Sequence, residues 1–156
     1  MPFRLEIVTP EKRAYADDVD FATLPGSEGE MGVLPHHEPL ISLLGEGVLR
    51  LRRGGHEEVF AIFGGFLQVR PDRVVVLAET ADMASEIDLE RAERARADAQ
   101  AVLEGGYVEP ADLAAARSAL QRALVRIRVA ERGPRGMARS ERDAMRRAAN
   151  EEPSDQ

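Results

Sequence analysis

The sequence contains no cysteine, no tryptophan and a single lysine, and only 4% of its 156 residues are aromatic. The absence of cysteine excludes disulfides, zinc–thiolate and iron–sulfur sites, and a cysteine nucleophile. Few aromatics predict an aliphatic core, for which 44% hydrophobic residues suffice. No apolar run approaches the ~20 residues of a membrane-spanning helix, and the N-terminus lacks the charged and apolar regions of a signal peptide. We therefore expect a protein that is made and kept in the cytoplasm or an equivalent matrix.

Negative charge is concentrated in the first half of the chain. Residues 1–86 carry eight basic and fifteen acidic residues, which accounts for the whole net charge of −7. This distribution argues against nucleic acid or an anionic membrane surface as a partner. The chain also lacks the Gly-Lys-Ser/Thr ending of a phosphate-binding loop, which excludes a P-loop ATPase.

Residues 1–86 contain short segments in which apolar and polar residues alternate. In the first segment Phe3, Leu5 and Ile7 share one side of an extended chain. Glycine pairs and turn residues separate the segments and leave no room for crossover helices. The pattern predicts an antiparallel sandwich or barrel. The expected strands are residues 3–9, 19–24, 47–53, 56–63, 66–70 and 73–78.

Glycines mark two places where the backbone is constrained. Within residues 26–32 a glycine recurs at every third position, which predicts a turn with positive φ rather than a nucleotide loop. Gly64 and Gly65 predict a bulge or a close approach of strands.

Residues 87–132 change to a helical composition rich in alanine, arginine and glutamate. One helix is expected from residue 87 to 104, ended by Gly105 and Gly106. A second is expected from Glu109 or Pro110 to Arg132. Two helices with such a short connection form an antiparallel hairpin.

Each expected helix carries a stripe of small or apolar residues, and we predict that the stripes face each other. Alanine buries little apolar area, so the hairpin should be loosely stable and able to open, slide or extend. Residues 133–156 lack such a stripe and are expected to form a disordered or partly helical tail. The stripes are Ala92, Ala95, Ala99 and Val102 on the first helix and Leu113, Ala116, Leu120, Ala123, Leu124 and Ile127 on the second.

Four motifs stand in order along the chain: PGSEGEMGVLPHHEPL (25–40), GGFLQV (64–69), VLAETA (76–81) and IDLERA (87–92). Together they resemble the epsilon subunit family of bacterial F-type ATP synthase, and the resemblance runs from about residue 3 to residue 132. It implies a sandwich of about ten antiparallel strands in residues 1–86 and a two-helix regulatory domain in residues 87–132. The last 24 residues of the chain depart from the family pattern.

The resemblance implies a non-catalytic rotor subunit of the central stalk that needs no cofactor. Such a subunit binds the gamma subunit and the ring of c subunits and works beside the alpha/beta catalytic hexamer. It couples proton translocation to ATP synthesis, and its C-terminal helices inhibit ATP hydrolysis. The expected location is the cytoplasmic face of the bacterial cell membrane, with membrane contact only through the complex.

The family pattern assigns contacts to two loops. Ser27, Glu28 and Glu30 match the loop that lies against the c ring, and His37 matches a histidine at the gamma interface. His36 occupies a position that usually holds glycine, which leaves the local turn geometry open. Two adjacent histidines in an extended chain point in opposite directions, and no further ligand cluster supports a metal site.

The resemblance also implies an ATP-binding pattern in the second half, which in some members holds the hairpin retracted. Two residues depart from it: Asp82 stands where glutamate is common, and Asp98 stands where a further arginine is expected. The alternative to an ATP-binding role for Asp88 is a structural one: it caps the N-terminus of the helix, or forms a capping box with Ser85. The residues implied for ATP are Asp82, Asp88, Arg91, Ala92, Arg122 and Arg126.

The arginines of the second helix allow further interpretations. Arg122 and Arg126 are four positions apart and share a helical face, which suits a phosphate group, a solvated basic face or an acidic partner. In an extended hairpin, Arg117, Arg122, Arg126 and Arg128 are expected to meet acidic surface on the catalytic beta subunit.

Two other classes of protein compete with this interpretation. An enzyme is disfavoured because no Gly-x-Ser-x-Gly or His-Glu-x-x-His motif occurs. A free-standing nucleotide-sensing or adaptor module would keep the same two-part fold. A stable complex with gamma is expected of the rotor subunit alone.

Overall fold

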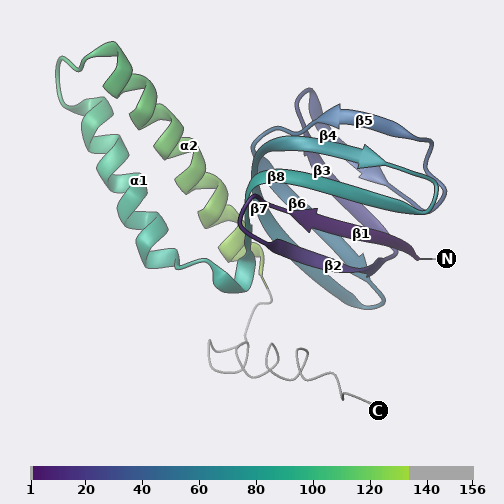
Figure 1. Cartoon of the computed structure of the whole chain (residues 1–156). Coiled ribbons are helices and arrows are strands. Elements are labelled where there is room, and N and C mark those ends of the chain that lie inside the picture. The colour runs from purple at the N-terminus through teal and green to yellow at the C-terminus, as the bar shows by residue number, and fades with distance from the viewer. Residues whose placement is uncertain (1, 134–156) are drawn as a thin grey trace.

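The structure is a computed structural model that describes residues 2–133. Within these residues a sheet of eight strands curls into a sandwich, and a two-helix hairpin lies beside it (Figure 1). The predicted fold class is confirmed. The tail expected at residues 133–156 lies outside the described residues, apart from Gly133.

The strands come first along the sequence and the helices last, as the change in sequence period predicts. A short 3₁₀ helix, η1 (Ala84–Glu86), joins the two parts. The helices are α1 (Leu89–Glu104) and α2 (Pro110–Arg132). The strands are β1 (Phe3–Val8), β2 (Arg13–Val19), β3 (Phe21–Gly26), β4 (Gly29–Val33), β5 (Leu40–Leu43), β6 (Gly47–Arg53), β7 (His56–Val69) and β8 (Arg73–Met83).

The sheet has the strand order β2-β1-β8-β7-β6-β3-β4, and β5 pairs with β7. The described residues form eight strands, where the resemblance implies about ten. The expected strands 56–63 and 66–70 are one continuous strand, β7. The pairing is also not wholly antiparallel: β1 and β8 run parallel. These two strands begin and end the sandwich, so the long connection that a parallel pair needs is available.

The core is aliphatic, as the composition predicts. Phe3, Leu5 and Ile7 alternate into it from β1, which confirms the predicted period of two. Leu24, Leu49 and other fully buried side chains fill the space between the layers. At about 25 cal/mol for each Å² of buried apolar surface, this core is the main source of the sandwich's stability.

β7 changes the side that it turns to the core at Gly64 and Gly65. Ile62 lies in the core before the pair and Leu67 after it, an odd separation that a strict period of two forbids. The two glycines have φ of 67° and 119°, which only glycine adopts readily. The register of β7 against β8 is unbroken across the pair, so no bulge forms there. A Cβ at Gly65 would lie 1.9 Å from the Leu77 carbonyl oxygen, which confirms the predicted close approach of strands. The change of side places Phe63 and Phe66, on the outer side, in different surroundings.

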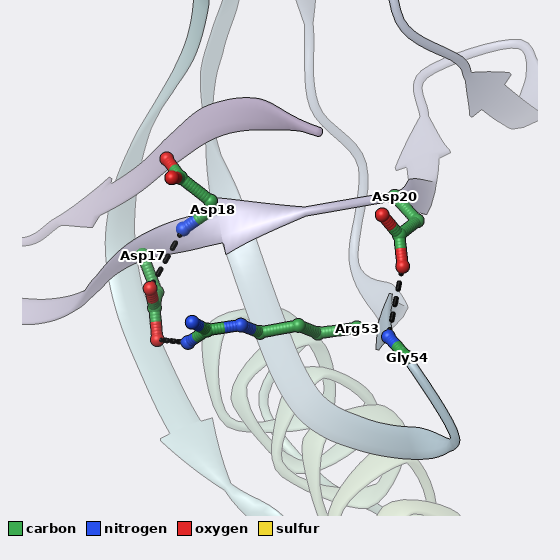
Figure 2. Close-up of polar contacts among 5 residues, drawn as sticks. All are labelled: Asp17, Asp18, Asp20, Arg53 and Gly54. Carbon is green, nitrogen blue, oxygen red and sulfur yellow. Dashed lines mark hydrogen bonds and ion pairs between the residues drawn. The ribbon is translucent and has the colours of Figure 1, made fainter. Parts of the chain in front are cut away.

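The turn between β6 and β7 is fastened to the corner between β2 and β3 (Figure 2). Arg53 donates a hydrogen bond to the Asp17 carboxylate, and the Gly54 backbone N–H donates to Asp20 at 2.8 Å. The Asp20 backbone N–H donates to the Arg52 carbonyl at 2.8 Å. These contacts hold the edge strand β2 beside β6 and close the sandwich.

Tyr15 of β2 is expected to ionise well above the ordinary pH range of a tyrosine. Burial, together with the carboxylates of Asp17 and Glu58, raises the pKa of the Tyr15 hydroxyl to about 12. Its ring packs edge-on against Phe60, 5.6 Å between centroids. Because this pKa is raised in the folded state, stability should fall as pH rises from ~10, the ordinary tyrosine pKa, through the folded-state value.

Absorbance titration of tyrosinate checks this expectation. The chain has two tyrosines, Tyr15 and Tyr107. In the Tyr107→Phe variant Tyr15 is the one tyrosine left, so its ionisation is followed alone and should occur near pH 12. A single step near pH 10 in that variant, before unfolding, would contradict the packing of Tyr15.

α1 begins two residues later than predicted because Asp88 is its N-cap. The Asp88 carboxylate accepts a hydrogen bond from the Arg91 backbone N–H at 3.2 Å. The capping interpretation of Asp88 is therefore confirmed. The capping box with Ser85 is wrong, since Ser85 lies in η1.

The α1 side of the hairpin seam is partly as predicted. Ala92 and Ala99 are buried, whereas Ala95 and Val102 are exposed. Half-buried Leu103 extends the same face, four positions after Ala99. The predicted stripe was wrong by one position at these two sites because several alanines allow more than one helical face.

The α2 side also differs from the prediction, because α2 has two partners. Ala116 and Ala123 are buried as expected, but Leu124 is 39% exposed. Val125 and Val129 are buried against the sheet instead. α2 therefore packs on α1 and on the sandwich, and the hairpin contacts the sandwich mainly through it.

Candidate functional site

The loop expected to face the c ring is the tip of the β3–β4 hairpin. Ser27, Glu28 and Glu30 are all exposed there. Of the three loop glycines only Gly29 has positive φ, 137°. Gly26 is needed for space instead, since a Cβ there would lie 2.6 Å from the Gly29 carbonyl oxygen. Three polar side chains are thus presented together at one end of the sandwich.

Pro35 and His36 form a tight turn between β4 and β5. The His37 backbone N–H donates to the Leu34 carbonyl at 3.2 Å, and His36 has φ of 63°. Proline followed by a residue with positive φ is typical of a type II turn, where glycine is favoured. The turn geometry is therefore kept although histidine stands at the usual glycine position. His37 lies just beyond the turn, its Nδ1 2.8 Å from the Glu38 carbonyl oxygen.

Glycine at position 36 is expected to stabilise the protein. A non-glycine residue in this region costs about 1–2 kcal/mol, partly offset by the greater flexibility of unfolded glycine. His36→Gly should therefore raise the free energy of unfolding by roughly 0.5–1 kcal/mol in urea denaturation. Glu38→Gly, also exposed but without positive φ, is the control and should destabilise. Equal effects of both variants would contradict the strained turn.

The described residues contain no group of three or more histidine, aspartate or glutamate side chains that could hold a metal ion. None of their helices is long and apolar enough to cross a membrane.

Two arginines of α2 meet carboxylates of the sandwich. Arg126 Nε lies 3.0 Å from Asp82 Oδ2 on β8, and Arg122 Nε lies 3.6 Å from Glu46 Oε1 in the β5–β6 connection. Both guanidinium groups also lie over the Phe63 ring of β7, at 4.7 Å for Arg126 and 5.8 Å for Arg122. The structure therefore brings Asp82, Arg122 and Arg126 together, as the ATP pattern requires, but pairs these arginines with carboxylates.

A small apolar contact lies beside these ion pairs. Val125 and Val129 of α2 pack against Val59, Ala61 and Ala84 of the sandwich and η1. Apart from Phe63, the buried side chains of this cluster are valine and alanine, each of which buries little apolar area.

The remaining residues implied for ATP lie at the start of α1. Asp88 is engaged as the N-cap, and Ala92 is buried in the helical seam. Arg91 and Asp98 are exposed. Within residues 2–133, no hydrogen bond or ion pair joins the Asp88 or Arg91 side chain to the two paired arginines.

The four arginines expected to meet the beta subunit do not share one face. Arg117 and Arg128 are eleven positions, about three helical turns, apart and are both exposed. Arg122 and Arg126 face the sandwich in this conformation.

An open apolar row on the sheet was not identified from the sequence. Leu43, Phe66 and Leu77 are cross-strand neighbours on β5, β7 and β8. They are 54%, 53% and 48% exposed, and Ile41, on the same side of β5, is 72% exposed. Four large exposed apolar side chains on one face are typical of a protein interface. We call Ile41, Leu43, Phe66 and Leu77 the apolar row.

We call the tip of the β3–β4 hairpin, with Ser27, Glu28 and Glu30, the polar loop. The polar loop lies next to the apolar row. The Ser27 backbone N–H donates to the Leu43 carbonyl at 3.2 Å. A sandwich with an open apolar face and a polar loop beside it is typical of a protein that binds a partner through its sheet.

Comparison with known proteins identifies the family. The family model of the ATP synthase Delta/Epsilon chain beta-sandwich domain matches residues 2–84, and that of the Delta/Epsilon chain long alpha-helix domain matches residues 85–131. The chain belongs to the ATP synthase delta/epsilon chain family. It is therefore a non-catalytic subunit of an ATP synthase.

Relatives cover most of the chain. An ATP synthase epsilon chain of Dehalococcoides mccartyi is 46% identical over 129 residues, 83% of this chain and 92% of the relative. That of Herpetosiphon aurantiacus is 47% identical over 132 residues, 84% of this chain and 96% of the relative. Among solved structures, a chain of the Euglena gracilis mitochondrial ATP synthase (OSCP/F1/c-ring) matches with a TM-score of 0.68 at 28% identity. That match covers 77% of this chain and 76% of the other.

Proposed function

We propose that this chain is the rotor subunit that joins the gamma shaft to the c ring and couples ion translocation to ATP synthesis. The apolar row carries this proposal. An isolated soluble domain gains nothing from four large exposed apolar side chains on neighbouring strands, whereas an interface core needs them. We assign the apolar row to gamma, with His37 as a further contact.

The polar loop is assigned to the c ring. Ser27, Glu28 and Glu30 are exposed at the hairpin tip next to the apolar row. Single exposed ion pairs contribute only ~0–1 kcal/mol, so this contact would depend on several of them. In this arrangement the complex lies on the cytoplasmic face of the cell membrane and supplies the subunit's membrane contact.

The hairpin is assigned to regulation of ATP hydrolysis. When extended, it would present Arg117 and Arg128 together with the two arginines now paired to the sandwich. Residues 1–86 serve as the docking unit in this proposal and residues 87–132 as the regulatory unit. A regulatory nucleotide would bind to the residues that the resemblance implies for ATP. Equilibrium dialysis with ATP tests this assignment: the wild-type chain should show saturable binding, and the Arg122→Ala variant should show none.

Deletion of residues 87–156 tests the proposal. The truncated chain should still co-purify with gamma, because the apolar row is intact, and ATPase activity of the assembled complex should rise several-fold. Co-purification followed by an ATPase assay, with the full-length chain as control, measures both. Failure of the full-length chain to bind gamma would favour a free-standing adaptor, and unchanged hydrolysis would contradict the regulatory role.

A further inference from the structure

We propose that Arg122, Arg126, Glu46, Asp82 and Phe63 form an internal clasp that holds α2 on the sandwich without a nucleotide. The inference concerns the regulation of the hairpin and rests on the proposed function only in assigning it a regulatory role. It follows from the side-chain contacts and from the charge balance at the junction.

The clasp arises from two parallel rows on α2. Arg122 and Arg126 form one row with a spacing of four, and Val125 and Val129 form the other. Residues four apart lie one above the other on a helix, so each row meets the sheet as a line. The valine row packs on Val59, Ala61 and Ala84, and the arginine row reaches the Phe63 ring beside it.

The charges within the clasp balance. Two arginines four apart repel each other on a bare helix face. Asp82 and Glu46 supply one carboxylate to each guanidinium, at 3.0 and 3.6 Å. Phe63, 2% exposed, adds the negative face of its ring to both cations. The arginines are thus neutralised by the chain itself, and a triphosphate would have to displace two carboxylates to bind them.

The clasp also fixes where α2 sits. Apart from Phe63, the buried part of the apolar contact is made of valine and alanine, which alone distinguish weakly between neighbouring positions along the helix. Glu46 and Asp82 stand on different elements and accept two arginines at a fixed spacing, so a slide of one turn would leave a charge unpaired at each end. The clasp therefore selects one docked position of the hairpin.

Charge reversal and charge exchange test the clasp in the isolated full-length chain, without nucleotide and at low salt. Arg126→Glu and Asp82→Arg should each speed amide hydrogen exchange in the middle of α2 on the order of tenfold. The double variant Arg126→Glu/Asp82→Arg restores an ion pair and should bring exchange back to near the wild-type rate. The control is Arg117→Glu, the same charge change on the exposed side of α2, which should exchange like wild type.

Each outcome decides the proposal. Single variants that exchange like wild type, or a double variant no slower than the singles, would overturn it. Wild-type protection that develops only after magnesium–ATP is added would also overturn it, because the arginines would then serve a ligand. Gamma binding through the apolar row should be unaffected by all four variants, so loss of the clasp and loss of docking are distinguishable.

Discussion

The variant Phe66→Asp/Leu77→Asp is expected to bind the gamma subunit at least roughly 100-fold more weakly than wild type. The two side chains are cross-strand neighbours at the centre of the apolar row. Binding would bury two carboxylates without partners, and burial of an unpaired charge is strongly unfavourable. Titration of purified gamma with each chain, followed by calorimetry or surface binding, measures the loss.

Two controls show that the loss of binding comes from the apolar row and not from unfolding or from any added negative charge. Phe66 and Leu77 are 53% and 48% exposed, so the variant should keep its thermal unfolding midpoint within a few degrees. Tyr107→Asp changes an apolar side chain that is 86% exposed in the α1–α2 connection, away from the row, and should bind gamma like wild type. Wild-type affinity of the doubly substituted sandwich would contradict the assignment of the apolar row.

The fold could be predicted where the sequence signal is local. The alternation in residues 3–9 and the glycine pair before Tyr107 specify a strand and a helix end through neighbouring residues alone. The pairing of β1 with β8 could not, because it joins the two ends of the sandwich and depends on how the whole sheet closes. The length of β7 was also missed, since a glycine pair normally separates strands.

In the candidate site, too, local features could be predicted from the sequence and contacts between distant segments could not. The spacing of Arg122 and Arg126 predicts a shared face, which the structure confirms. Their partners could not be predicted, because Asp82 is 44 positions from Arg126 and Glu46 lies on another element. The apolar row requires the register of three strands, and alternation alone does not say which outer face a helix will cover. Four of the five residues at 40–44 are apolar, more than one buried face needs, and this was the available signal.

Gly65→Ala is expected to be among the most destabilising single substitutions in the sandwich. A Cβ at this position would lie 1.9 Å from the Leu77 carbonyl oxygen, a backbone atom, and φ is 119°. Unfavourable φ and overpacking together should lower the free energy of unfolding by roughly 3 kcal/mol or more. For a domain of this size that corresponds to a fall in midpoint temperature on the order of 10 °C, measurable by circular dichroism.

Two other glycines separate the causes of this effect. Gly106 has φ of 72°, and a Cβ there would meet nothing within 4 Å, so Gly106→Ala should show the cost of the backbone conformation alone, about 1–2 kcal/mol. Gly55 has open space and no positive φ, so Gly55→Ala should be nearly neutral. If Gly65→Ala were as stable as Gly55→Ala, β7 would not change sides there. The change of side places Phe63 against Arg122 and Arg126 and leaves Phe66 in the apolar row. The clasp and the apolar row therefore depend on the same glycine, Gly65.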